Sequence, residues 1–385
     1  MEKIITLGLA DTRPGLRPFG IAEQDRLNHI YLIGQTGTGK STLLANMVMQ
    51  DSRLGNGFCL IDPHGDLASQ LSADIGGDHI YWQLGDPDCP YGYNPLTKVP
   101  PSRRPLVASG FVDTLKKQWA DSWGPRMEHL LRYAVLALLD QPSAQIGDIV
   151  RLYVDKDFRR EAVANISDPQ VHAFWTIEVP KMKYLTSLDG VAPIANKIGA
   201  FLANPIVRKA VSEPERPIRF RRAMDEGQAI IVNLAKGRIG SDNADIIGGL
   251  IVTNIMNAAL SRHDLPQEDR RPFFLYADEF HHFTTTSVAD LLSEARKYGL
   301  GLCACNQNSS QTDKLVLDAI TGNAGTIMSL RIGAQDAPLI ARQFGTIEAH
   351  HFTQLPNHRG FIQLMSQGRK LAPFSFKTLP PTTNM

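Results

Sequence analysis

The stretch that decides the fold runs from residue 30 to residue 48 and reads IYLIGQTGTGKSTLLANMV. Its first four residues, Ile30–Ile33, are apolar and predict a buried β-strand, and the residues after Ser41 have the apolar spacing of a helix. The pattern G-x-x-x-x-G-K-[ST] between them lets successive backbone N–H groups curl around a polyphosphate at a helix N-terminus. A strand, a phosphate-binding loop and a helix in this order predict a site for a nucleoside triphosphate.

Two side chains of this loop have expected chemical tasks. Lys40 would reach the β- and γ-phosphates, and the hydroxyl of Ser41 would be a ligand of Mg²⁺. A chance match in a glycine-rich turn is the competing interpretation, and the flanking strand and helix argue against it. The expected nucleotide-binding residues are Gly34, Gln35, Thr36, Gly37, Thr38, Gly39, Lys40, Ser41 and Thr42.

An acidic pair at the end of a second apolar run is expected to complete the site. Residues Phe273–Ala277 are apolar, and Asp278 and Glu279 follow them directly. Asp278 would hold the Mg²⁺ shell through water, and Glu279 would act as the general base toward the water that attacks the γ-phosphate. An Asp-Glu pair after an apolar strand also occurs by chance, but together with Lys40 it predicts a hydrolase rather than a nucleotide switch.

Composition and charge describe an ordinary globular protein. The chain has 385 residues, of which 43% are hydrophobic and 21% charged, and its formal net charge is +1. No global basic field therefore indicates nucleic acid, and a DNA-binding surface would have to be local, as inside a ring. The four cysteines form no C-x-x-C pair and are expected to be reduced core residues rather than zinc ligands.

The sequence is also expected to belong to a soluble, cytoplasmic protein. Its N-terminus lacks a basic start followed by an apolar stretch. The longest apolar helix expected, at residues 246–260, is interrupted by Thr253, Asn254 and Asn257, which a membrane span would seldom carry together.

Short apolar runs recur along the chain and are mostly separated by helix-like segments. Strands that are apolar on both faces are typical of a parallel sheet covered by helices, which predicts an α/β fold. The runs lie at residues 30–33, 58–61, 230–234, 273–277, 302–305 and 327–332. Near the end of the chain, residues 360–365 and 372–376 bracket Gly368 and predict a closing antiparallel hairpin, followed by a frayed tail at 380–385.

A stretch of different character lies between the second and third of these runs. A helix is expected to begin at Pro125, because the apolar residues from Met127 to Leu139 keep one face at helical spacing. We interpret the stretch as an all-α domain at residues 98–225, inserted into a nucleotide-binding domain formed by residues 1–97 and 226–385.

Several further stretches carry a more specific signal than the phosphate-binding loop. They are residues 61–67 (IDPHGDL), 93–96 (YNPL), 123–128 (WGPRME), 278–280 (DEF), 293–299 (SEARKYG), 322–326 (GNAGT) and 331–337 (RIGAQDA). In this order they resemble the HerA and FtsK superfamily of hexameric DNA-pumping ATPases, and within it the type IV secretion coupling proteins of conjugation. The resemblance extends from about residue 30 to residue 379 and includes the helical insertion.

The resemblance implies a RecA-like motor: a mostly parallel sheet with helices on both faces, plus the all-α insertion. It implies ATP and Mg²⁺ as cofactors, a homo-hexameric ring with ATP at the subunit interfaces, and DNA in the central channel. Gln307 would sense the γ-phosphate, and Arg296 would act on the neighbouring subunit's nucleotide. An arginine inserted in trans would neutralise charge that develops on the γ-phosphoryl group.

Some of these assignments have alternatives. The competing interpretation of Arg296 is a solvated helix residue without a role in catalysis, and Arg331 or Arg126 could then act on the neighbouring nucleotide. Asp62 could orient water, but Asp-Pro-His-Gly is also ordinary turn chemistry, and we expect the turn role.

The sequence departs from the family at two places. Members often carry Gln-Asn after Asp-Glu-Phe, where this chain has His281 and His282, whose adjacent side chains make a poor metal pair. Coupling proteins usually begin with transmembrane helices, whereas some thirty residues precede the loop here. Either a membrane anchor is missing from this sequence, or the chain is a soluble relative that meets a membrane only through a partner.

Contacts with DNA are the least specified part of the interpretation. Three tryptophans of the insertion, Trp119, Trp123 and Trp175, could stack on bases, although core packing is the expected use. Basic residues of the insertion could bind phosphates, although such charges are usually solvated. They are Arg103, Arg104, Lys116, Lys117, Arg159, Arg160, Lys181 and Lys183.

The leading functional hypothesis is an ATP-driven motor that moves DNA through a hexameric ring. A second hypothesis keeps the ATPase and changes the cargo to protein substrates of secretion. A third is a nucleotide-gated adaptor, whose helical insertion would recruit a relaxosome, secretion-channel or nuclease partner. A small-molecule kinase is disfavoured, because nothing in the sequence marks a pocket for an acceptor.

Overall fold

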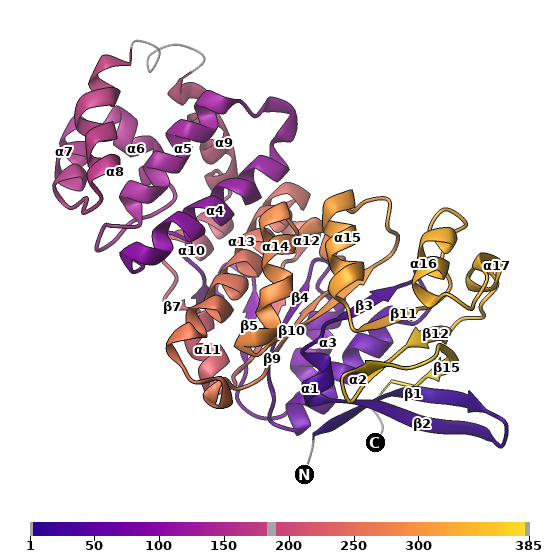
Figure 1. Ribbon diagram of the computed structural model, residues 1–385. Coiled ribbons are helices and arrows are strands. Elements are labelled where there is room, and N and C mark those ends of the chain that lie inside the picture. The colour runs from indigo at the N-terminus through magenta and orange to yellow at the C-terminus, as the bar shows by residue number, and fades with distance from the viewer. Residues whose placement is uncertain (1–2, 183–189, 382–385) are drawn as a thin grey trace. The chain divides into compact units, whose positions relative to one another are not determined.

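The computed structural model describes residues 3–182 and 190–381 (Figure 1). The chain divides into two compact units. Unit 1 comprises Met1–Tyr81, Phe220–Ala235 and Ala258–Met385, and unit 2 comprises Trp82–Arg219 and Lys236–Asn257. Unit 1 is thus assembled from three separate segments of the chain. The domain limits expected from the sequence, 1–97 with 226–385 and 98–225, stay a prediction.

Unit 1 is built on a large mixed sheet. Among the described residues its strands follow the order β2-β1-β15-β12-β11-β3-β10-β9-β4-β8-β5. Their bounds are β1 (Ile4–Thr12), β2 (Gly15–Ala22), β3 (Ile30–Ile33), β4 (Gly57–Asp62), β5 (Ile80–Gln83), β8 (Ala229–Asn233), β9 (Phe273–Ala277), β10 (Leu300–Asn306), β11 (Thr326–Ser329), β12 (Arg359–Gln363) and β15 (Phe374–Thr378).

The centre of the sheet is parallel. β3 lies between β11 and β10, β10 pairs with β9, and β4 lies between β9 and β8, all in parallel. Every residue of β3, β4, β9 and β10 is buried, as expected for strands covered on both faces. The six apolar runs of the sequence coincide with these strands and with β8 and β11, which confirms the predicted α/β fold.

Helices cover both faces of this sheet (Figure 1). On one face, Leu32, Leu60 and Tyr276 join the core formed with the apolar sides of α2 and α3. Because side chains alternate along a strand, their neighbours point to the opposite face, where α14 and α15 lie. The helices of unit 1 include α1 (Glu23–Arg26), α2 (Lys40–Arg53), α3 (Asp66–Asp74), α11 (Phe220–Glu226), α14 (Thr286–Ala295), α15 (Lys314–Asn323), α16 (Ala337–Phe344) and α17 (Ala349–Thr353).

An antiparallel extension continues the sheet beyond β11. β12 pairs with β15, with Ile362 opposite Phe374, so the predicted closing hairpin is confirmed. Its tip is the short pair β13 (Met365–Ser366) and β14 (Arg369–Lys370), and the chain turns there through Gln367 and Gly368 at positive φ. β15 then pairs with β1, which forms a hairpin with β2 that the sequence analysis did not predict. The predicted frayed tail lies outside the described residues from position 382 onward.

In its described part, unit 2 is helical apart from the end of β5 and one short parallel pair, β6 (Tyr91–Gly92) with β7 (Arg216–Pro217). One of its helices begins at Pro125, as predicted, and three others begin at side-chain caps, Asp155, Asp168 and Asn204. Its helices include α4 (Arg104–Gln118), α5 (Pro125–Leu138), α6 (Asp148–Val154), α7 (Lys156–Ala164), α8 (Pro169–Ala173), α9 (Val191–Leu202), α10 (Pro205–Ser212), α12 (Lys236–Ile239) and most of α13 (Ser241–Leu260).

One long helix has the length and composition of a membrane span. Within the described part of the chain, the segment Ser241–Asp264 meets these criteria, and 78% of its most apolar stretch is buried inside the folded chain. Length and composition alone do not separate a buried core helix from a membrane span.

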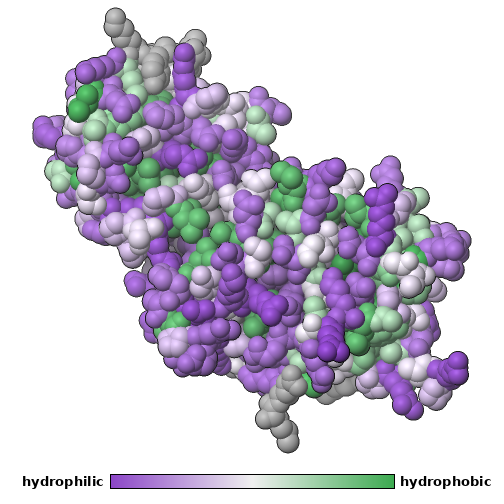
Figure 2. Space-filling model, in the orientation of Figure 1, coloured by the Kyte–Doolittle hydropathy of each residue, from purple (hydrophilic) through white to green (hydrophobic). Residues whose placement is uncertain are grey.

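On the face seen in Figure 2, hydrophilic residues predominate, and hydrophobic residues occur between them in small groups.

A buried ionic cluster joins three elements of unit 1. The guanidinium of Arg26, at the end of α1, donates to both carboxylate oxygens of Asp51 in α2, at 2.7 and 2.6 Å. The hydroxyl of Tyr276 in β9 donates to the same carboxylate, and the ring of Phe274 lies 3.5 Å from the guanidinium carbon. The pair is almost fully enclosed, with side-chain exposures of 2% and 0%. The cluster therefore ties the helix that follows the loop to the strand that carries the acids.

We expect Asp51→Asn to lower the free energy of unfolding of unit 1 by about 3–5 kcal/mol, because Arg26 would remain buried without a counter-charge. Urea unfolding followed by circular dichroism measures this change. The control is Asp11→Asn, which breaks the exposed pair with Arg359 and should cost less than about 1 kcal/mol. Equal effects of the two substitutions would contradict the prediction.

Candidate nucleotide-binding site

The phosphate-binding loop connects β3 to α2, and its glycines follow from backbone geometry. Gly37 and Gly39 have φ values of 75° and 112°, which residues with a side chain rarely adopt. Gly34 packs against Leu330, and a Cβ added at Gly34 would lie 2.8 Å from the Leu330 Cβ. The left-handed backbone therefore favours glycine at positions 37 and 39, and close packing requires it at position 34.

Lys40 is the first residue of α2 and folds back over the loop. Its Nζ donates to the carbonyl oxygens of Gly34 at 2.6 Å and Gln35 at 3.3 Å. The side chain of Thr38 donates to the same Gln35 oxygen at 2.6 Å and braces the turn. Neutral carbonyl oxygens thus hold the ammonium group against the loop. Because phosphate oxygens are negatively charged, they would form stronger hydrogen bonds with it than these carbonyls do.

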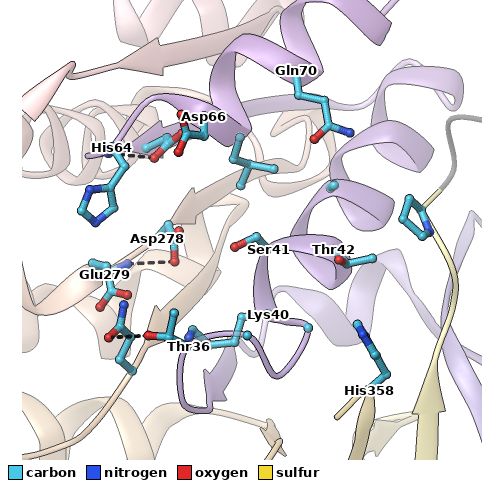
Figure 3. A pocket seen from close by; sticks show the side chains of 17 residues that line it. Thr36, Lys40, Ser41, Thr42, His64, Asp66, Gln70, Asp278, Glu279 and His358 are labelled. Carbon is cyan, nitrogen blue, oxygen red and sulfur yellow. Dashed lines mark hydrogen bonds between the residues drawn. The ribbon is translucent and has the colours of Figure 1, made fainter. Parts of the chain in front are cut away.

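The predicted acids lie across the cavity from this loop. Asp278 and Glu279 follow β9 directly, and Figure 3 shows Asp278 facing Ser41. Glu279 has a left-handed backbone with φ of 49°, and its N–H donates to Asp278 Oδ1 at 3.1 Å. Both residues are buried, and Glu279 Oε2 lies 3.5 Å from His281 Nδ1. A left-handed residue other than glycine is uncommon, and such strain is often found at functional sites.

The environment of Asp278 is unfavourable for a lone negative charge. The pKa of its carboxyl group is raised from 3.8 to about 6, chiefly by burial and also by the charges of Glu279 and Asp62, while Lys40 opposes these effects. A divalent cation at this place would reverse the balance, because its charge favours the ionised carboxylate. The acids therefore fit a Mg²⁺ ion better than they fit an empty pocket.

One cavity of about 590 Å³ brings these parts together (Figure 3). Its wall includes Thr36, Gly37, Gly39, Lys40, Ser41 and Thr42 from the loop side and Asp278, Glu279 and Gln307 from the strands. The remaining expected loop residues support the cavity without lining it: Gly34 and Thr38 are buried, and Gln35 is exposed. A volume of this size lies within the usual range of small-molecule sites.

A Mg²⁺ ion in the cavity would share its ligands between the protein, a bound molecule and water. Among the described residues, no group of three or more His, Cys, Asp or Glu side chains is arranged to hold a metal ion by itself. Mg²⁺ commonly takes one or two protein oxygens and completes its shell with phosphate and water. Ser41 and Asp278 are placed for such a shared shell.

Gln307 lies immediately after β10, next to the loop. The hydroxyl of Thr36 donates to Gln307 Oε1 at 3.1 Å. Its neighbour Asn306 is fully buried and accepts a hydrogen bond from the His281 N–H at 3.2 Å. Asn306 thus fixes the turn that follows Glu279, a role that the sequence analysis did not assign.

The candidate arginines lie in different places. Arg296 is exposed in the turn after α14, donates to the side chain of Asn28 and lines a separate cavity of about 460 Å³. Arg331 contacts the loop, with its Nε 3.4 Å from Gln35 Oε1. Arg126 belongs to unit 2. Among the described residues, no arginine lines the nucleotide cavity.

Asp62 has the predicted turn role. Its carboxylate accepts the N–H groups of His64 and Ala68, both at 2.9 Å, and so caps the start of α3. The same turn places His64, Asp66 and Gln70 on the cavity wall. Sequence analysis assigned no function to these three residues, although the IDPHGDL stretch was a signal that this turn mattered.

Three of the four cysteines are core residues, as predicted, and Cys89 is not. Cys59, Cys303 and Cys305 are buried in strands, and Cys89 is half-buried, all as free thiols. Burial raises the pKa of the Cys303 thiol to about 12, so it is not a reactive thiolate.

Several candidate DNA contacts in unit 2 are occupied within the protein. Arg104 is buried and pairs with Asp140 at 2.7 Å, so it does not belong to a surface that could meet phosphates. Lys116 pairs with Glu128, Arg160 pairs with Asp157, and Lys183 lies outside the described residues.

The predicted core role of the tryptophans holds best for one of them. Trp175 is buried, and its ring lies 5.3 Å from that of Phe174. Trp123 is only half-buried and donates to Glu128.

Several solved protein structures have a fold similar to that of this chain. No protein-family profile and no curated protein sequence matches the chain. VirB4 of Thermoanaerobacter pseudethanolicus is similar with a TM-score of 0.65 and 13% identity, over 98% of this chain and 96% of that one. The plasmid coupling protein TrwB with the non-hydrolysable ATP analogue ADPNP gives a TM-score of 0.63 and 17% identity, over 92% of this chain and 86% of TrwB.

A further TrwB structure contains ADP and Mg²⁺. It gives a TM-score of 0.60 and 17% identity, over 94% of this chain and 88% of TrwB. These likenesses show that the chain has the RecA-like P-loop fold of VirB4 and TrwB. The resemblance stated from the sequence is confirmed at that level.

Replacing Asp278 by Asn should stabilise the nucleotide-free protein above pH 6. The folded state retains the carboxyl proton up to about pH 6, whereas the unfolded chain releases it near 3.8, so the ionised form destabilises the fold above pH 6. A difference in pKa of this size corresponds to about 3 kcal/mol. The gain should be largest above pH 6 and disappear near pH 4.

Thermal unfolding midpoints of the two proteins, measured from pH 4 to pH 8, test this expectation. Asp269→Asn, at an exposed position outside the cavity, serves as the control and should change stability by less than about 0.5 kcal/mol. A gain for Asp278→Asn that is the same at every pH would show that its carboxyl group is not perturbed.

Proposed function

We propose that this chain is an ATP-hydrolysing motor of the type IV secretion class, which works as a hexameric ring and moves DNA. One observation carries the proposal: a single cavity is lined by Lys40 and Ser41 on one side and by Asp278 and Glu279 on the other. These are the groups that a phosphoryl-transfer site needs, namely a phosphate cradle, a metal position and a base.

Each group has a proposed role that follows from its position. The loop N–H groups and the ammonium of Lys40 bind the β- and γ-phosphates, and Ser41 with Asp278 positions Mg²⁺. Glu279 removes the proton from the attacking water, and Gln307, which contacts Thr36 at 3.1 Å, detects the γ-phosphate. The complexes of TrwB with ADPNP and with ADP and Mg²⁺ support the same cofactors for this chain.

The composition of the cavity wall favours a ring in which a neighbouring subunit supplies an arginine. Among the described residues no arginine lines it, although charge on the transferring γ-phosphoryl group is commonly neutralised by one. Arg296 is exposed and lies at a different cavity of the same unit. We therefore assign it to the nucleotide of a neighbouring copy, so that hydrolysis depends on assembly.

DNA is the proposed cargo because of the resemblance of the sequence to DNA-pumping ATPases and the fold shared with the coupling protein TrwB. The formal net charge of +1 supplies no general attraction for DNA, so binding would depend on local charge within a ring. A protein-moving ATPase and a nucleotide-gated adaptor are the outcomes that would replace this proposal.

Steady-state ATP hydrolysis with and without single- or double-stranded DNA at low salt tests the motor directly. DNA should accelerate hydrolysis, and the acceleration should fall steeply as salt rises, because phosphate contacts release counterions. Lys40→Ala should abolish nucleotide binding, whereas Glu279→Gln should keep binding and lower kcat by about 10²–10⁴-fold.

The exposed residue Glu294 supplies the control, since Glu294→Gln should behave as the wild type. Slow hydrolysis that is indifferent to DNA would reject the DNA motor. If that slow hydrolysis were nevertheless lost in Lys40→Ala, the nucleotide site would stand, and a protein-moving ATPase or a nucleotide-gated adaptor would replace the DNA motor.

The arginine assignment has a separate test by subunit mixing. Arg296→Ala should lower kcat about 10³-fold without weakening nucleotide binding, because the guanidinium acts only in the transition state. Mixing this variant with inactive Lys40→Ala subunits should restore part of the activity, since Arg296 of one subunit then serves the intact site of the other. Lys297→Ala is the neighbouring control, and failure of the mixture to recover activity would exclude action in trans.

A further inference from the structure

We propose that His358 contacts the nucleoside end of the bound nucleotide and so contributes to its affinity. The inference rests on the proposed nucleotide-binding function and extends it to a part of the site that no sequence motif marks. His358 immediately precedes β12 and follows the loop by more than 300 positions in the sequence.

The backbone of His358 is fixed between the loop and the C-terminal strand. Its N–H donates to the carbonyl of Thr38 at 2.9 Å, and its own carbonyl accepts the N–H of Thr378 at 2.9 Å. The residue has a φ of 64°, a left-handed conformation that few residues other than glycine adopt. This conformation holds the ring beside the loop rather than in line with β12.

The imidazole ring occupies the space next to Gly39. A Cβ added at Gly39 would lie 2.8 Å from His358 Nδ1, so the ring fills the place that a side chain at position 39 would take. The ring is nevertheless exposed, and it lines the same cavity as Lys40 and Ser41. It is therefore supported on one side by the loop and open on the other to a ligand.

Its location in the cavity specifies which part of a ligand it would meet. Figure 3 shows His358 on the opposite side of Lys40 and Thr42 from Asp278 and Glu279. If the γ-phosphate lies at the acids and the β-phosphate in the loop, the sugar and base must extend toward His358. The reverse orientation would place the base against two carboxylates.

The surroundings of His358 suit a sugar and base better than a phosphate. Ala45 and Pro381 line the cavity, and both have apolar side chains. Asn46 in α2 donates to the carbonyls of Leu379 and Pro380, at 3.3 and 3.0 Å, and holds the segment after β15 against this part of the cavity. An aromatic ring beside apolar groups can stack on a base or donate to a ribose hydroxyl.

The test compares two ligands by titration calorimetry with the full chain: ADP, and inorganic tripolyphosphate, which fills only the phosphate-binding part. His358→Asn removes the ring but keeps a residue that tolerates the left-handed backbone. It should raise the Kd for ADP about 10-fold and leave the Kd for tripolyphosphate unchanged. In ATP hydrolysis it should raise KM by a similar factor with little change in kcat.

Two controls separate this inference from the proposed function. His351→Asn alters an exposed histidine of α17 and should bind both ligands as the wild type does. Lys40→Ala should bind neither. Unchanged ADP affinity in His358→Asn would overturn the inference while leaving the nucleotide site intact.

Two further outcomes would also overturn it. Equal weakening of ADP and tripolyphosphate would assign His358 to support of the loop instead of contact with the nucleoside. A wild-type protein that binds neither ligand would reject the proposed function together with the inference.

Discussion

The parallel pairing of β3 with β10 on one side and β11 on the other is the constraint on which the rest of the structure depends. Ile33 lies opposite both Asn306 and Ser329, so the carboxyl ends of three strands meet at one edge of the sheet. β9 joins them in the same direction. The loop after β3, Gln307 and the acids after β9 therefore converge without any of them having to be adjacent in sequence, as is usual for ligands at such an edge.

The elements that could be predicted from the sequence are those whose signal is local. The strands Ile30–Ile33 and Phe273–Ala277 are continuous apolar runs, and burial on both faces requires such runs. The hairpin β1–β2 could not be predicted in this way, because half of β2 is exposed and it contains Pro18 and two glycines. Edge strands face solvent along much of their length, so they need no continuous or strictly alternating apolar pattern.

The residues of the candidate site also fall into those that a local sequence pattern identifies and those that it does not. Lys40, Ser41, Asp278 and Glu279 were found because a fixed spacing or a strand end identifies them. His358, His64 and Gln70 reach the cavity from other segments and belong to no pattern that identifies a contact with the ligand. The raised pKa of Asp278 depends on burial, and the partner of Arg296 in the proposed ring is another chain; neither property is encoded in a local stretch of residues.

The pairing of β3 also has a consequence for how the protein is made. Ile30 pairs with Cys303, so at ribosomal rates the fully buried strand β3 waits roughly 15–50 seconds for its partner to be synthesised. During that time its unpaired backbone and apolar side chains are open to wrong associations, whereas the helices of unit 2 rely on contacts made earlier along the chain. The nascent chain cannot complete the cavity before Pro381 is added. The complete cavity therefore forms only after the segment that follows β15 has been synthesised.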